Sequence, residues 1–133
     1  MNIYGQVTLM AVQLIETKQV STPLDARNLA AKNIIISKSS QKKSCPKNAF
    51  LGLCEAGLVY GIPRGIYSEK NNAQKKNKEY VIKAVELLRL NLELADDKNA
   101  LWAAVMNGKD MSHNSQMDVV LALWRKGRIL TTV

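Results

Sequence analysis

The sequence predicts an all-α fold, and three observations lead to that prediction. Apolar residues recur at helical spacing in several separate segments. Residues that favour helix ends, such as serine, asparagine, proline and glycine, stand between those segments. A length of 133 residues with 47% hydrophobic content is enough for one core that buries about two thirds of the unfolded chain's surface. We therefore predict a single compact domain over residues 1–133, built from five or six short helices.

The beginning of the chain predicts two helices followed by a loop. The first helix covers residues 3 to about 17, where apolar side chains recur at helical spacing: Ile3, Val7, Met10, Ala11 and Leu14. Ser21 or Thr22, just ahead of a proline, is a start signal for a second helix over residues 24 to about 36. The three isoleucines at the end of that segment fit a strand equally well, which leaves its last turn open. The polar segment 37–44 predicts a loop.

The stretch 39–65 organises the rest of the sequence. It holds both cysteines, two of the three prolines and four of the seven glycines. Its centre predicts a short helix over residues 46–57, with Ser44 capping its first amides and Gly57 ending it. One face of that helix is apolar and predicted to be buried, and it carries Ala49, Phe50, Leu53 and Cys54.

An extended connection is predicted after this helix. Residues 59–78 contain Gly61, Pro63, Gly65 and a pair of asparagines, and all of these favour turns and loops. Such a length is unusual inside a compact domain, where long connections are either functional or mobile.

Two core helices are predicted next. Residues 79 to about 90 carry an apolar arc too wide for a surface helix, so we expect this helix near the centre of the core. Asp96 or Asp97 is placed to cap the following helix, which ends near Gly108 and contains Trp102. We expect Trp102, like Trp124 further on, to be a core residue.

The last predicted helix is QMDVVLALWRK, capped by Asn114 or Ser115 and ended by Gly127. Capping explains the polar residues 113–118, although the same side chains would form a polar cleft if they faced residues 39–47. The closing segment RILTTV predicts either a short edge strand or a segment packed along the surface.

Positive charge is concentrated in the middle of the chain. The formal net charge is +8, and residues 37–78 hold nine basic and two acidic side chains, an excess of seven. Four lysines lie just before and within the first turn of the 46–57 helix, whose amino end attracts anions, and Arg64 is placed to approach from the following loop. The predicted anion-binding residues are therefore Lys38, Lys42, Lys43, Lys47 and Arg64. The alternative is a solvated loop whose lysines only favour solubility.

The function class favoured by this charge is a basic binding module for a nucleic-acid backbone or an acidic protein surface. Base-specific DNA recognition is not expected, because the final helix begins with Gln116, Met117 and Asp118 and has basic residues only near its far end. Contacts to the phosphate backbone fit the composition better.

An enzyme is the rival prediction. Cys45 is placed at a helix amino end among lysines, which increases the nucleophilicity of a thiol. If His113 lies within hydrogen-bond reach, with Asn114 or Asp118 orienting it, the set has the residue types of a cysteine hydrolase. The alternative for Cys45 is inert packing. An oligomer that acts through an apolar surface is a third possibility.

Composition argues against several other classes. Two cysteines and one histidine do not supply the ligands of a usual zinc site, and no cofactor is expected. The ends of a helix from Cys45 to Cys54 lie roughly 13 Å apart, too far for a disulfide, so both thiols are expected to be free. No apolar run approaches the roughly 20 residues of a membrane helix, and the amino terminus lacks the pattern of a signal peptide. We expect a soluble cytoplasmic protein.

Two segments carry a resemblance to a known family. SSQKKSCPKNAFLGLCEAGLVYGIPRGIY and HNSQMDVVLALW resemble a family of small bacterial proteins known only as a domain of unknown function. The resemblance covers most of residues 39–126. It implies a bacterial or phage-associated cytoplasmic origin, and it brings no activity, cofactor or catalytic residue with it.

Overall fold

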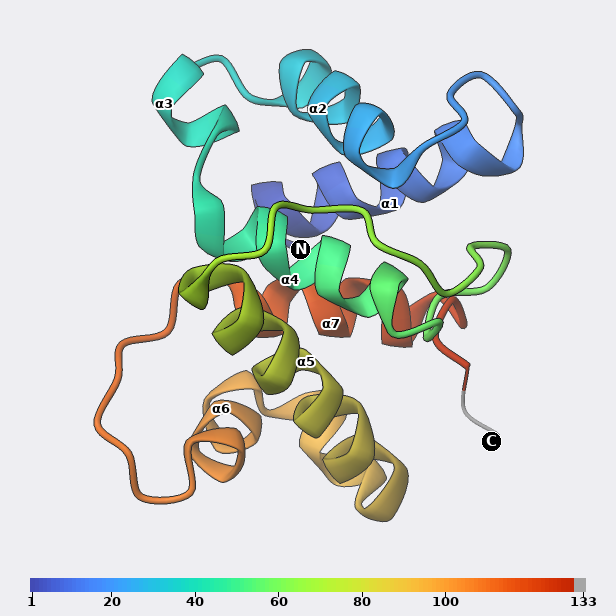
Figure 1. Ribbon diagram of the computed structural model, residues 1–133. Helices are drawn as coiled ribbons and strands as arrows, with labels where there is room; N and C mark the ends of the chain where they lie inside the picture. The colour runs from blue at the N-terminus through green and yellow to red at the C-terminus, as the bar shows by residue number, and fades with distance from the viewer. Residues whose placement is uncertain (131–133) are drawn as a thin grey trace.

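The computed structural model describes residues 1–130, and this part of the chain is all-α (Figure 1). Within it, six helices of nine or more residues are joined by one single-turn helix and one 3-10 helix. In chain order the elements are α1 (Ile3–Glu16), α2 (Pro23–Ile34), α3 (Lys38–Gln41), α4 (Ser44–Glu55), α5 (Asn72–Leu90), η1 (Leu92–Asp96), α6 (Lys98–Met106) and α7 (Gln116–Arg125). The prediction of a single all-α domain with five or six short helices is confirmed.

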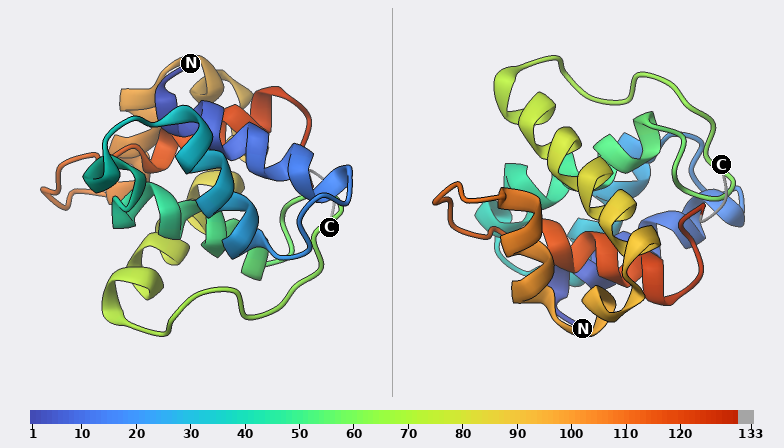
Figure 2. Two further views of the ribbon diagram at one scale, coloured as in Figure 1. Left: turned by 90° about the horizontal axis from the view of Figure 1, so that it is seen from above. Right: turned by 90° about the horizontal axis from the view of Figure 1, so that it is seen from below.

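Helix α4 lies at the centre of the fold. It packs against α5 and α7 and also touches α2, while α1 and α2 pack against each other on one side of the molecule and α5 and α6 on the other (Figures 1 and 2). Helix α7 joins the two sides because it contacts α1, α4 and α5. Five of the largest fully buried apolar side chains come from α4 and α7: Phe50, Leu51, Leu53, Met117 and Leu123.

A glycine on α4 allows that helix to cross α5 at very short range. A Cβ atom added to Gly52 would lie only 2.8 Å from the Cα of Lys78 on α5, closer than side chains tolerate. Because the two helices touch at this point, Lys78 sits next to the carboxyl-terminal turn of α4. The crossing therefore brings together residues that are 26 positions apart in sequence.

Several predicted helix ends are confirmed. The Thr22 side chain accepts a hydrogen bond from the amide of Asp25 at 3.2 Å and so begins α2. Asp97 caps α6 in the same way. Gly57 follows the last turn of α4 with φ at +72°, a conformation that glycine adopts at little cost.

Helix α5 begins earlier than predicted. Its first residue is Asn72, so the prediction of an extended connection through 59–78 was wrong for residues 72–78. The physical reason is the asparagine pair: Asn71 acts as a helix cap, with its side-chain oxygen accepting from the amide of Gln74 at 2.8 Å. Asparagine favours both turns and caps, and here capping prevails.

The start of α4 also differs from the prediction. The helix begins at Ser44 with Lys43 in the capping position, so Ser44 does not cap it, and no side chain within residues 1–130 hydrogen-bonds to its first amides. Pro46 permits this earlier start because proline is tolerated anywhere in a first turn. The predicted loop 37–44 contains the single-turn helix α3, which Ser37 caps.

The carboxyl-terminal segment pairs with the loop after α4. Val59 and Ile129 form an isolated antiparallel bridge, and the amide of Leu130 donates to the carbonyl of Leu58 at 2.9 Å. The prediction for RILTTV left an edge strand and surface packing open, and residues 128–130 form this bridge. Residues 131–133 of that segment lie outside the described residues.

Candidate functional site

Five lysines line two neighbouring pockets on the side of the molecule where α4, α5 and the preceding segment meet. We call this surface the lysine face, and it consists of Lys42, Lys47, Lys70, Lys75 and Lys78. The segment 66–71, which we call the strap, supplies residues to both pockets, and Asn71 at its end lines both. The lysine face therefore joins residues from two parts of the sequence.

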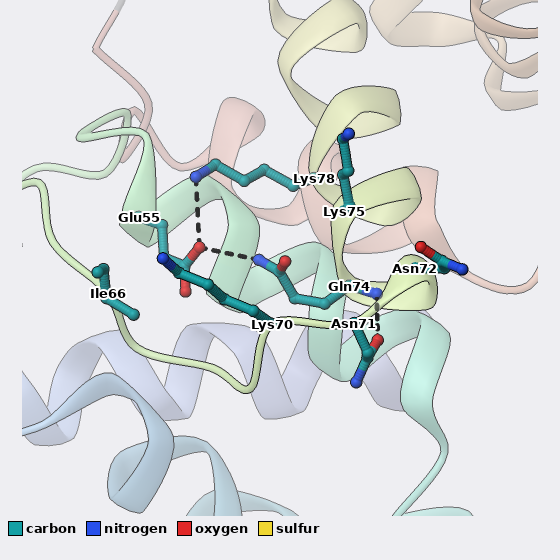
Figure 3. A pocket seen from close by; sticks show the side chains of 8 residues that line it. All are labelled: Glu55, Ile66, Lys70, Asn71, Asn72, Gln74, Lys75 and Lys78. Carbon is teal, nitrogen blue, oxygen red and sulfur yellow. Dashed lines mark hydrogen bonds and ion pairs between the residues drawn. The ribbon is translucent and has the colours of Figure 1, made fainter.

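The larger pocket has a volume of about 480 Å³ and lies between the strap and the first turns of α5 (Figure 3). Three lysines, three side-chain amides, one isoleucine and one carboxylate line it: Lys70, Lys75, Lys78, Asn71, Asn72, Gln74, Ile66 and Glu55. Figure 3 shows Gln74 and Lys78 reaching from α5 toward Glu55 at the end of α4. The pocket thus presents lysine and amide groups around a single buried acid.

The Glu55 carboxylate fastens the strap to the helices. Its Oε2 accepts hydrogen bonds from the amides of Tyr67 and Ser68, both at 2.9 Å, and from the Ser68 hydroxyl at 2.7 Å. Its Oε1 accepts from Nε2 of Gln74 at 2.8 Å and from Nζ of Lys78 at 3.3 Å. Since five donors converge on one side chain, the strap is held in one position relative to α4 and α5.

These contacts also determine the charge state of Glu55. Burial by itself would raise the pKa of this carboxyl. Hydrogen bonds from Ser68, Tyr67 and Lys78, together with the positive charge of Lys78, outweigh burial, and the pKa lies below its usual value. Glu55 is therefore ionised at neutral pH, and its charge is compensated by its own donors.

The smaller pocket has a volume of about 260 Å³ and lies over the first turns of α4. Lys42 and Lys47 line it together with the strap residues Ser68 and Glu69. Its other lining residues are Leu24, Ser44, Asn48, Leu51 and Asn71. Because the amino ends of both α4 and α5 border these pockets, their helix dipoles add to the positive potential of the lysines.

Most of the positive charge on this side of the molecule is left without an acidic partner. Residues 1–130 contain three ion pairs: Lys78 with Glu55, Lys98 with Asp118 and Arg128 with Glu16. Lys78 is thus the one basic side chain of residues 37–78 that forms an ion pair within the described chain. The carboxyl-terminal acids do not neutralise the charge excess there.

The structure places the predicted anion-binding residues in different surroundings. Lys42 and Lys47 line the smaller pocket, as described above. Lys38 is exposed on α3, and Nζ of Lys43 lies 5.9 Å from the centre of the Tyr4 ring. None of these side chains is buried.

Arg64 does not join the lysines at the amino end of α4. Its guanidinium donates to the carbonyl of Ala56 at 3.4 Å, at the carboxyl end of that helix. Ala56 lies twelve positions after Ser44, which separates the two ends by about 18 Å. The expectation that Arg64 approaches the helix start is corrected, because a cation is favoured at a helix carboxyl end, where unpaired carbonyls gather.

Two residues of the thiol hypothesis, His113 and Asp118, are engaged in other contacts. Cys45 is half-buried in the first turn of α4. The Nε2 atom of His113 accepts a hydrogen bond from the amide of Met117 at 3.0 Å, so it caps α7. Burial lowers the pKa of His113, and a neutral imidazole has a single acceptor nitrogen, which this cap occupies. Asp118 forms an ion pair with Lys98 at 3.2 Å, so both His113 and Asp118 have partners other than Cys45, and the cysteine hydrolase stays a prediction.

The polar segment 113–118 is used for local structure. The amide of Asn114 donates to Oε1 of Gln116 at 2.7 Å, and Nε2 of Gln116 donates to Oδ1 of Asn77 on α5 at 3.1 Å. Ser115 occupies the capping position of α7, but its side chain makes no capping hydrogen bond within residues 1–130. Histidine thus supplies the cap that the sequence predicted from Asn114 or Ser115.

A metal-binding cluster and a membrane-spanning helix are both absent from the described chain. Within residues 1–130, no three histidine, cysteine, aspartate or glutamate side chains gather as a metal site would require. In the same residues no helix has the length and apolar composition needed to cross a bilayer. The two cysteines there are free thiols, and Cys54 is fully buried.

Three residues of the lysine face were missed by the sequence analysis: Lys70, Lys75 and Lys78. Their segment was interpreted as an irregular connection, so no common surface was assigned to them. The Asn71 cap was the signal that would have placed the last two on a helix.

The fold and the lysine face define a class of protein: a small, basic, all-α domain with one charged and concave surface. The chain belongs to the family described as a family of unknown function (DUF6979), which matches residues 1–130. The resemblance to an uncharacterised domain is therefore confirmed. No curated protein and no solved structure matches the chain.

Proposed function

We propose that this protein is a small helical binding module that engages an anionic partner through the lysine face. The observation that carries the proposal is the grouping of five lysines around two adjoining pockets. Four of the five form no ion pair within residues 1–130. A nucleic-acid backbone and an acidic protein surface are the two partner classes that such charge attracts.

The concave shape of the lysine face and the direction of the two helices both increase its positive electrostatic potential. A pocket in which one sign of charge predominates focuses the field and raises the local concentration of oppositely charged partners, and here three lysines stand against Glu55 and two against Glu69. The amino ends of α4 and α5 add two partial positive charges at the same place. Since the five contacts on Glu55 hold the strap in position, the lysines on it and beside it are presented on a fixed surface.

Two triple variants with equal charge test the proposal. The first is Lys42→Gln, Lys70→Gln and Lys75→Gln, which removes three exposed lysines of the lysine face. The control takes three exposed lysines that line neither pocket, Lys32, Lys109 and Lys126, to glutamine. Both variants carry a formal net charge of about +5, so a difference between them reports position and not total charge.

Fluorescence anisotropy at 50 mM salt is the measurement, with labelled heparin, polyglutamate and double-stranded DNA as probes. We expect the unchanged protein and the control variant to bind at least one probe, and the lysine-face variant to lose most of that binding. Failure of the unchanged protein to bind any of the three polyanions contradicts the proposal. Equal losses in the two variants contradict it too, because binding then depends on net charge alone.

A further inference from the structure

The chemistry and dimensions of the lysine face point to one partner: we infer that it binds the sugar–phosphate backbone of a double-stranded nucleic acid. This inference rests on the proposed function and selects one of its two partner classes. It concerns backbone contacts, which carry no direct sequence information.

The side chains that line the two pockets are the types that contact phosphates. Contacts to nucleic-acid backbones come from arginine and lysine, from hydroxyl and amide side chains such as those of serine, asparagine and glutamine, and from helix amino ends. The lining residues include five lysines, three asparagines, one glutamine and two serines. Interfaces between proteins are instead depleted in lysine, and their binding energy comes mainly from tryptophan, tyrosine and arginine. The residues lining these two pockets include none of those three types, so an acidic protein is the poorer match.

The lining also distinguishes a duplex from a single strand. Proteins that bind single strands without sequence preference stack bases on aromatic side chains. Two tyrosines have contacts of their own: the hydroxyl of Tyr67 in the strap donates to the carbonyl of Pro63, and the Tyr4 ring lies beneath Lys43. No aromatic side chain is among the residues that line either pocket. A partner whose bases are already paired and stacked needs no such platform.

The lysine face is longer than one phosphate group. Lys47 and Glu55, whose carboxylate contacts Lys78, are eight residues apart on α4, a distance of about 12 Å along the helix axis. One strand of a duplex rises about 3.4 Å per nucleotide, so this distance spans roughly three or four phosphates. Lysines at both ends of such a span fit a run of phosphates better than a single phosphorylated group.

One acidic residue of the lysine face should weaken the binding of a nucleic acid, so its removal should raise the affinity. Glu69 is exposed, lines the smaller pocket with Lys42 and Lys47, and forms no ion pair within residues 1–130. Its negative charge repels a phosphate bound there. Removing one charge at about 8 Å in a largely aqueous setting changes affinity by about twofold. We therefore expect Glu69→Gln to strengthen duplex binding by about that factor.

The salt dependence of duplex binding gives the sharpest expectation. If all five lysines contact phosphates, the slope of log affinity against log salt concentration is about −4.5. Affinity then falls by a factor on the order of 500 between 50 and 200 mM salt. The triple variant at Lys42, Lys70 and Lys75 should have a slope smaller by about 2.7, whereas the control variant should keep the full slope.

The experiment compares four probes of similar charge: a 20-base-pair DNA duplex, an RNA duplex, a single DNA strand and polyglutamate. Tighter binding of at least one duplex than of the single strand and polyglutamate, together with the slope change, supports the inference. The ratio of the DNA to the RNA duplex tells which of them is preferred.

Tighter binding of polyglutamate or of the single strand overturns the inference. The proposed function survives that result, because the lysine face still binds an anion. Equal affinity for all four probes also overturns the inference, since binding then depends only on the negative charge of the probe. If no probe binds, the proposed function fails together with the inference, so the two failures are distinguishable.

Discussion

Replacing Glu55 by glutamine tests whether one carboxylate holds the strap and so shapes the lysine face. Glutamine has nearly the same shape, but its amide nitrogen cannot accept a hydrogen bond. If that nitrogen replaces Oε1, the contacts to Gln74 and Lys78 are lost, and if it replaces Oε2, three contacts to the strap are lost. Each orientation therefore removes at least two of the five hydrogen bonds.

The expected cost follows from those contacts. A hydrogen bond to a charged group contributes about 1.5–3 kcal/mol. The Lys78 contact is worth less than that, because about a third of this side chain is exposed and water screens its charge. The smaller of the two losses thus amounts to about 2–4 kcal/mol, a large part of the roughly 5–15 kcal/mol that stabilises a domain of this kind.

Urea unfolding and amide hydrogen exchange measure the two consequences. With a denaturant slope of about 1–3 kcal/mol per molar for a small protein, the urea midpoint of Glu55→Gln should fall by about 1 M or more. The amides of Tyr67 and Ser68 should exchange with solvent faster. Both donate to Oε2 of Glu55, which in the variant is either replaced by nitrogen or left on a side chain that has lost its two other contacts. Glu86→Gln, an exposed change on α5, is the matched control and should change neither quantity. A loss of less than about 0.5 kcal/mol in Glu55→Gln refutes the reasoning, as that is the range of surface substitutions.

The same carboxylate predicts a dependence of stability on pH. The pKa of Glu55 is lower in the folded protein than in the unfolded chain, where glutamate titrates at about 4.3. The stabilisation is therefore complete above that value and is lost as the pH falls through the folded-state pKa. Glu55→Gln should lose less stability than the unchanged protein over this acidic range. If the free energy of unfolding of the variant and of the unchanged protein falls in parallel with pH, groups other than Glu55 dominate acid unfolding.

Three further predictions concern the rest of the fold. Gly52→Ala should lower the free energy of unfolding by about 1–3 kcal/mol, because the added Cβ would lie 2.8 Å from the Cα of Lys78. An unchanged urea midpoint would contradict the close crossing of α4 and α5. The pKa of His113 is lowered by burial, so the unfolded chain takes up the proton first, and stability should fall as the pH drops below the ordinary value of about 6.5. His113→Ala should remove that part of the pH profile, which urea midpoints at pH 8 and pH 5.5 would show. Cys54 is fully buried and burial raises its pKa, so a thiol reagent should modify Cys45 alone in the native protein and both thiols in urea, whereas two rapid native reactions would contradict this packing.

The start of α5 shows why hydrophobic patterning failed there. Its first two turns look irregular in sequence because two positions that face the protein interior are polar, Gln74 and Asn77. Both are buried, and each is satisfied by a residue from another element: Gln74 by Glu55 and Asn77 by Gln116. A helical period in apolar residues cannot reveal a buried face that is built from hydrogen bonds.

Local chemistry accounts for what could be predicted. The helices, the caps at Thr22 and Asp97 and the stop at Gly57 depend on neighbours within a few residues, which sequence alone displays. The excess of positive charge in the middle third is likewise a property of the sequence. The number of helices and the all-α class followed from these signals.

Only the tertiary structure decided which charges share a surface. Lys42 and Lys47 line a pocket that adjoins the pocket of Lys70 because α4 and α5 cross at Gly52 and because Glu55 ties the strap to both helices. These contacts join residues that are about 10 to 30 positions apart, and no local signal encodes them. Sequence therefore determined how much charge this region carries, and the helix crossing and the strap determined on which surface the lysines lie.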